Sequence, residues 1–254
     1  MKMNGIIAVI ATACIISGAQ SVIADDLPAE FAHLTTLTID STLEKYFSNI
    51  TIRFDKSIST VIDSMYYFTD RDGSILNEDY KFRRLIVTKI DRNDDARYTI
   101  DFYPGMSVDP SFRIYINVGN ELKRLSPWIN GTQLTVPGDG YIYISGHTNN
   151  TFDQKRLFRI EGDEIIEVVQ PYYYVGLQSV TNREIVLMSL AGPVVTLLQG
   201  TSVTVLLKQI EPNQKFSYLL KTDFGLVGWV QFKPEELYMW NKPNPIEGLY
   251  YNGD

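Results

Sequence analysis

Most of the chain alternates hydrophobic and polar residues with a period of two, which is the pattern of strands that bury one face. Turn signals rich in Gly, Asp and Pro separate several of these stretches. The predicted strands are residues 59–68, 82–90, 97–103, 112–118, 133–136, 141–145, 157–160 and 165–169. Short strands with regular turns predict a mainly β protein, with an antiparallel sandwich or barrel-like domain over residues 25–175.

Only one stretch, residues 40–50, has the pattern of a helix. Asp40 and Ser41 are candidate capping residues, because their side chains can accept hydrogen bonds from the first turn. The apolar residues that follow recur at helical spacing: Leu43, Tyr46, Phe47 and Ile50. We therefore expect one short helix in an otherwise β domain.

The first 24 residues have the three parts of a cleaved secretory signal. Lys2 precedes an apolar run over residues 5–16, and Ala24 stands directly before two aspartates. This run is shorter than the roughly 20 residues that span a bilayer, and no later run approaches that length. The alternative is lipidation of Cys14, although the apolar run continues past that cysteine. We expect cleavage near Ala24, a periplasmic or secreted protein, and no stable membrane insertion.

Composition and charge limit the kinds of partner that the protein can bind. Cys14 is the only cysteine, so the cleaved chain folds without disulfides and needs a hydrophobic core, which a content of 44% hydrophobic residues can supply. Residues 25–178 carry 23 acidic and 16 basic side chains, and residues 179–237 carry 5 of each. Neither part has the basic stripe that binds a phosphate backbone, so we expect no nucleic-acid partner.

Residue patterns that carry catalysis are missing from the sequence. His33 and His147 are the only histidines, whereas a zinc site needs at least three suitable ligands. No phosphate-binding glycine loop and no GxSxG nucleophile turn is present. Acidic pairs such as Asp94-Asp95 belong to the residue types that start turns. We expect no enzyme activity, no metal and no cofactor.

Two motifs mark the C-terminal part. Residues 200–206 read Gly-Thr-Ser-Val-Thr-Val-Leu, and residues 225–230 read Gly-Leu-Val-Gly-Trp-Val, with a further strand over 216–221 between them. This pair resembles the bacterial SH3-like (SH3b) family, whose motifs are a KGTKVTVL strand and a dGxxGWV strand. The resemblance implies a small barrel over residues 176–240 with a non-catalytic attachment role. Phe216 stands where the family has a tryptophan, and the loop at residues 188–193 lacks the family's arginine.

Tyrosines gather where the two domains are expected to join, after Pro171, which interrupts a sheet ladder. Tyr172 and Tyr174 share one face of an extended strand. Together with Tyr218 and Trp229 they are the predicted ligand-binding residues, because such rings offer apolar area with a polar edge. The alternative is that the tyrosines only pack the domains together and that Trp229 fills the barrel core.

These observations predict an exported, non-catalytic envelope protein that binds a peptide, peptidoglycan or an envelope protein through the SH3-like module. One alternative is a cell-wall hydrolase with the module as its targeting arm, although no catalytic motif supports it. Another is an inhibitor or immunity-type protein, which fits the size, export and acidity of the chain. Residues 241–254 are expected to form an extended tail.

Overall fold

The computed structural model describes residues 28–39, 49–64, 83–103, 110–119, 121–146, 148, 150–209, 216–238 and 243–251. The predicted signal segment, Cys14, most of the predicted helix and His147 lie outside these ranges. The contacts separate residues 1–32 from residues 33–254. The described part of the first unit contains a short 3-10 helix, η1 (Ala29–Phe31).

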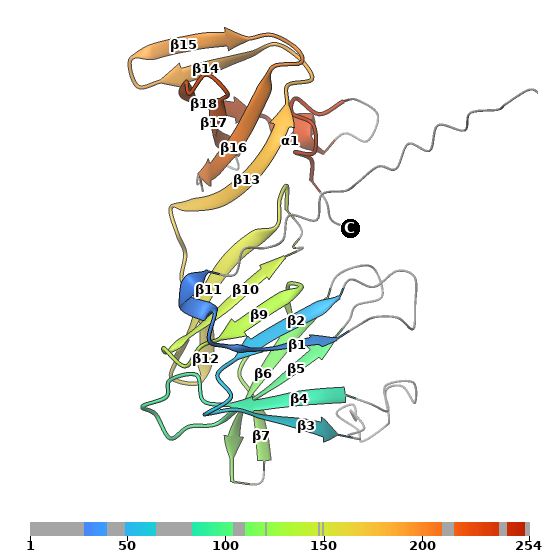
Figure 1. The fold of residues 1–254 in the computed structure, drawn as a ribbon, viewed down its shortest axis with the longest axis vertical. Coiled ribbons are helices and arrows are strands. Elements are labelled where there is room, and N and C mark those ends of the chain that lie inside the picture. The colour runs from blue at the N-terminus through green and yellow to red at the C-terminus, as the bar shows by residue number, and fades with distance from the viewer. Residues whose placement is uncertain are drawn as a thin grey trace, which may run out of the picture. The chain divides into compact units, whose positions relative to one another are not determined.

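The unit over residues 33–254 is mainly β, as predicted, and contains three sheets (Figure 1). The first has the order β1 (Thr35–Ile39), β2 (Ile50–Phe54), β9 (Gln133–Val136), β10 (Tyr141–Gly146), β11 (Gln154–Glu161) and β12 (Glu164–Glu167). The second has the order β3 (Thr60–Ser64), β4 (Arg83–Thr88), β5 (Tyr98–Tyr103), β6 (Ser111–Val118) and β7 (Glu121–Arg124), with β8 (Ile129–Asn130) also paired to β6. The strands pair antiparallel except β2 and β9, which are parallel.

These two sheets share one hydrophobic core, which makes them a sandwich. Alternate residues of strands such as β2 and β10 enter the core, as the period-two pattern predicts. The first sheet contributes Ile52, Phe54, Leu134 and Ile142, and the second contributes Ile86, Ile100, Phe112 and Ile114. Each fully buried side chain of this size stabilises the fold by roughly 1.5 to 3 kcal/mol relative to an exposed one.

The third sheet has its own core and forms the C-terminal part of the chain. Its order is β13 (Tyr172–Val180), β16 (Ser202–Gln209), β17 (Phe216–Thr222), β18 (Val227–Phe232), β14 (Ile185–Ser189) and β15 (Gly192–Leu197). Its described strands form an open sheet with β13 and β15 as edges, not the closed barrel that the family resemblance implied. β13 also runs across the domain boundary that we predicted between residues 175 and 176.

The short helix α1 (Pro234–Leu237) follows β18, and residues 243–251 further along the chain pack onto this sheet, whereas we expected an extended tail. Ile246 forms a bridge with Thr181. Ile246 and Leu249 are both 0% exposed and belong to the core of the third sheet. Residues 243–251 are therefore part of the packed module.

A bulge in β16 decides which side chains enter the core. Val205 and Leu207 pair with consecutive residues of β17, so Leu206 is left without a partner on that strand. The alternation expected from the sequence, with Val203, Val205 and Leu207 buried, ends at this point. Beyond the bulge Lys208, and not Leu207, faces the core.

Candidate ligand-binding face

Strand pairing assigns the residues of the third sheet to two faces, because directly paired residues point to the same side. One row across the sheet consists of Tyr173, Lys208, Tyr218 and Val230, which are all at most 7% exposed. The neighbouring row lies on the opposite face and consists of Tyr174, Leu207, Leu219, Trp229 and Met188. We call the face that carries this second row and Tyr172 the aromatic face.

Three of the four predicted binding residues lie on the aromatic face. Tyr172 and Tyr174 are 46% and 56% exposed. The rings of Tyr172 and Trp229 approach with their centroids 6.0 Å apart. Tyr218 is fully buried on the opposite face, so it does not join them. Trp229 is partly exposed and does not fill a barrel core, contrary to the alternative that we considered for it.

Gly228 lets β14 pack closely against β18. Gly228 is the buried residue before it in β18, and a Cβ atom built there would lie 2.8 Å from the Cβ of Leu187. Only glycine therefore lets β14 approach β18 closely enough for Met188 to pair with Trp229. This close approach places the indole of Trp229 beside β14 on the aromatic face.

A groove of about 620 Å³ opens beside Trp229. β14 and β18 pair only at Met188 and Trp229, and the groove lies between the two strands. It is lined by Arg183, Glu184, Ile185, Val186, Met188, Trp229, Val230, Gln231 and Phe232. Its walls are mostly apolar, and its two charged residues lie just before β14, four to five residues before Met188.

The two charged residues of the groove differ in their partners. Arg183 forms an ion pair with Glu236 of α1. Glu184 is exposed, and among the described residues it has no hydrogen-bond or ion-pair partner. The carboxylate of Glu184 is therefore the free charge of this groove.

Tyr174 is held against its own strand. A Cβ atom at Gly176 would lie 2.6 Å from a carbon of the Tyr174 ring, so the ring occupies the space that a side chain there would need. Gly176 has a φ of +71° in the bulged part of β13, a conformation that suits glycine. Ordering of an exposed ring before binding lowers the entropy cost of contact with a ligand.

Polar side chains meet around Tyr218 on the buried face of the third sheet. Its hydroxyl shares a hydrogen bond of 2.5 Å with Oγ1 of Thr151. Lys208 Nζ donates to Oδ1 of Asn150 at 2.9 Å and lies 4.7 Å from the centroid of the Phe216 ring. Burial lowers the pKa of Lys208 to about 8 and raises the pKa of Tyr218. None of these side chains lines the groove.

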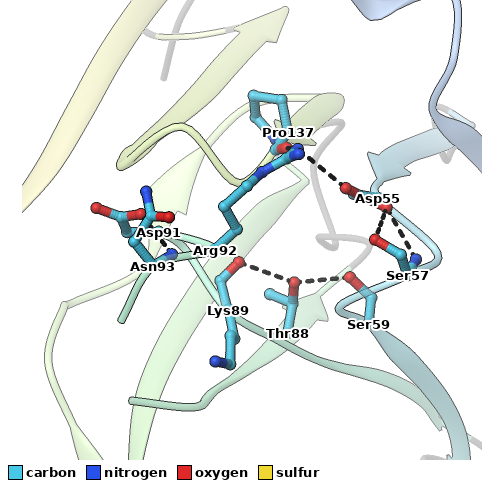
Figure 2. Close-up of polar contacts among 9 residues, drawn as sticks. All are labelled: Asp55, Ser57, Ser59, Thr88, Lys89, Asp91, Arg92, Asn93 and Pro137. Carbon is cyan, nitrogen blue, oxygen red and sulfur yellow. Dashed lines mark hydrogen bonds and ion pairs between the residues drawn. The ribbon is translucent and has the colours of Figure 1, made fainter. Parts of the chain in front are cut away.

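Acidic residues of the sandwich loops form turns instead of a reactive cluster. Asp55, Asp91, Asp94 and Asp139 each accept a hydrogen bond from the backbone N–H two residues later, which confirms the turn role expected for Asp94. Figure 2 shows Arg92 beside Asp55, to whose Oδ2 it donates at 3.1 Å. The Ser57 hydroxyl is the main cause that lowers the pKa of Asp55.

Within the ranges that the structure describes, no three His, Cys, Asp or Glu residues gather in a group that could hold a metal ion. His33 is exposed. Over the same ranges, no helix has both the length and the apolar character that a membrane crossing requires.

No protein-family model matches this chain, and neither a curated protein nor a solved structure matches it. The sequence did not point to Glu184 and Val186 as groove residues. The signal that was available is the stretch of residues 185–200, which contains no charged residue. Five of its large hydrophobic residues are exposed, namely Val186, Met188, Leu190, Val194 and Leu198. An uncharged, exposed hairpin at a sheet edge indicates an interaction surface.

Proposed function

We propose that this protein is a non-catalytic binding protein of the cell envelope, exported after cleavage near Ala24, and that it holds peptidoglycan stem peptides against its third sheet. The observation that carries the proposal is the Tyr172–Trp229 pair, which adjoins a groove of about 620 Å³ with mostly apolar walls. The SH3b-like motifs at residues 200–206 and 225–230 support an attachment role for the same sheet.

The chemistry of the groove suits an extended peptide. Trp and Tyr rings supply apolar contact area with a polar edge, and they lose little conformational entropy when they bind. β18 pairs with β14 at one position only, so its edge along Gln231 borders the groove. A peptide that lies there gains backbone hydrogen bonds from this edge and places alternate side chains toward Trp229.

Sedimentation of the exported protein with purified sacculi tests the proposal. Replacing Trp229 or Tyr172 with alanine removes one ring of the pair, and we expect each change to weaken binding about tenfold, because a central aromatic contact contributes on the order of 1 to 2 kcal/mol. Phe224→Ala is the matched control. Phe224 is an aromatic residue in the turn between β17 and β18, is 90% exposed and does not line the groove.

The Trp229 variant stays folded, because its ring lies on the outer face and not in the core. Unfolding in urea checks this point beside the binding measurement. Variants that are folded and bind like the wild type would contradict the proposal, and so would a wild-type protein that does not sediment with sacculi. Release of soluble fragments from the sacculi would favour the hydrolase instead.

A further inference from the structure

The carboxylate of Glu184 gives the groove a preference for cationic groups, which the apolar walls alone would not give. The charge of Arg183 is compensated by Glu236 of α1, whereas the Glu184 carboxylate has no cationic partner among the residues that the structure describes. Residues 179–237, the sequence range that contains all the groove residues, are neutral in sum, with 5 acidic and 5 basic side chains. A cationic group that enters the groove is therefore attracted, and an anionic group is repelled.

We infer that the groove recognises a peptide with a free primary amine, whose ammonium group binds Glu184 while the apolar part of the peptide contacts Trp229 and Met188. This inference rests on the proposed function. The ammonium donates up to three hydrogen bonds, which the two carboxylate oxygens of Glu184 accept. The apolar wall formed by Val186 lies between the two contacts.

The spacing of the two contacts sets the length of the ligand. Glu184 and Met188 are separated by four residues along an extended segment, which corresponds to about 13 Å at roughly 3.3 Å per residue. An extended peptide of about four residues covers this distance. Uncrosslinked stem peptides are of this length class and carry a free amine, whereas crosslinking turns that amine into an amide.

Chemical acetylation of sacculi separates the amine contact from the rest of the site. Acetic anhydride converts free amines into neutral amides, so we expect wild-type protein to bind acetylated sacculi about three- to fivefold more weakly than untreated sacculi, the range of an exposed ion pair. Glu184→Gln should bind untreated sacculi as weakly as the wild type binds acetylated ones, and acetylation should not weaken it further. Glu121→Gln, an exposed glutamate of β7, should behave like the wild type.

The outcomes distinguish this inference from the proposed function. If acetylation and Glu184→Gln leave binding unchanged while Trp229→Ala abolishes it, the amine contact is refuted and the proposed function stands. If acetylation weakens the wild type and Glu184→Gln equally, the amine binds elsewhere, which also refutes the inference. If the wild type binds neither preparation, the proposed function itself fails.

Discussion

Lys208 is a buried cation without an acidic partner in the described part of the chain, and its replacement by methionine should stabilise the protein. Methionine keeps most of the aliphatic length and removes the ammonium. The hydrogen bond from Nζ to Asn150 is lost. Oδ1 of Asn150 still accepts from the backbone N–H of Thr151 at 2.8 Å, so no buried acceptor is left unsatisfied.

The lowered pKa gives the size and the sign of the effect. Burial takes the pKa of Lys208 from 10.5 to about 8, a change that corresponds to about 3 kcal/mol at about 1.4 kcal/mol per pKa unit. Because the folded-state pKa is below the unfolded one, the unfolded chain binds the proton more tightly. Burial of the charged lysine therefore lowers the stability of the folded protein by the full amount below pH 8, and this loss disappears as the pH rises from about 8 to 10.5. Loss of the Asn150 hydrogen bond costs about 1 kcal/mol, so the net gain at pH 7 is about 2 kcal/mol.

Urea unfolding of both proteins at pH 7 and at pH 10.5 measures this difference. The comparison with the Lys208→Met variant cancels the titration of all other groups. We expect the variant to be more stable at pH 7, and we expect its advantage to vanish at pH 10.5. A variant that is less stable at pH 7, or a difference that does not change with pH, would show that Lys208 is solvated or paired and would refute the reasoning.

Two other changes test the packing of the third sheet by urea unfolding. Thr151→Val leaves the buried hydroxyl of Tyr218 without its partner and should lower the free energy of unfolding by about 1 to 3 kcal/mol. The double variant Thr151→Val/Tyr218→Phe should regain most of this loss, because it removes the unsatisfied hydroxyl. Equal losses in the single and the double variant would contradict this account. Gly228→Ala introduces a Cβ atom 2.8 Å from that of Leu187 and should lower the free energy of unfolding by about 1 to 3 kcal/mol. An unchanged urea midpoint would mean that β14 can move away from β18 without loss of stability.

The alternation of polar and apolar residues predicted several of the strands. β9 was predicted with its observed bounds, Gln133–Val136, because polar and apolar residues alternate there. β7 was missed because all four of its residues are exposed and leave no periodicity. β2 was missed because its first residue, Ile50, also completes a helical spacing in the sequence. The parallel pairing of β2 with β9 joins segments about 80 residues apart, and no local pattern encodes such a contact.

The aromatic face was only partly predictable, for a different reason. Tyr172 and Tyr174 were placed on one face correctly, because they belong to the regular part of β13. Tyr218 and Trp229 lie on different strands, and their faces depend on how those strands are paired. The groove arises from the separation of β14 and β18, a property of two strands about 40 residues apart that neither strand shows by itself.

The bulge makes position 206 a place where the end of β16 can lose a residue without changing its faces. Val205 and Leu207 already pair with consecutive residues of β17, Leu220 and Leu219, so removal of Leu206 would leave a regular strand with the same pairing. Lys208 would still face the core, and Leu207 would still lie on the aromatic face. In any diverged copy of this chain that keeps both faces, a residue gained or lost in β16 should therefore fall at position 206.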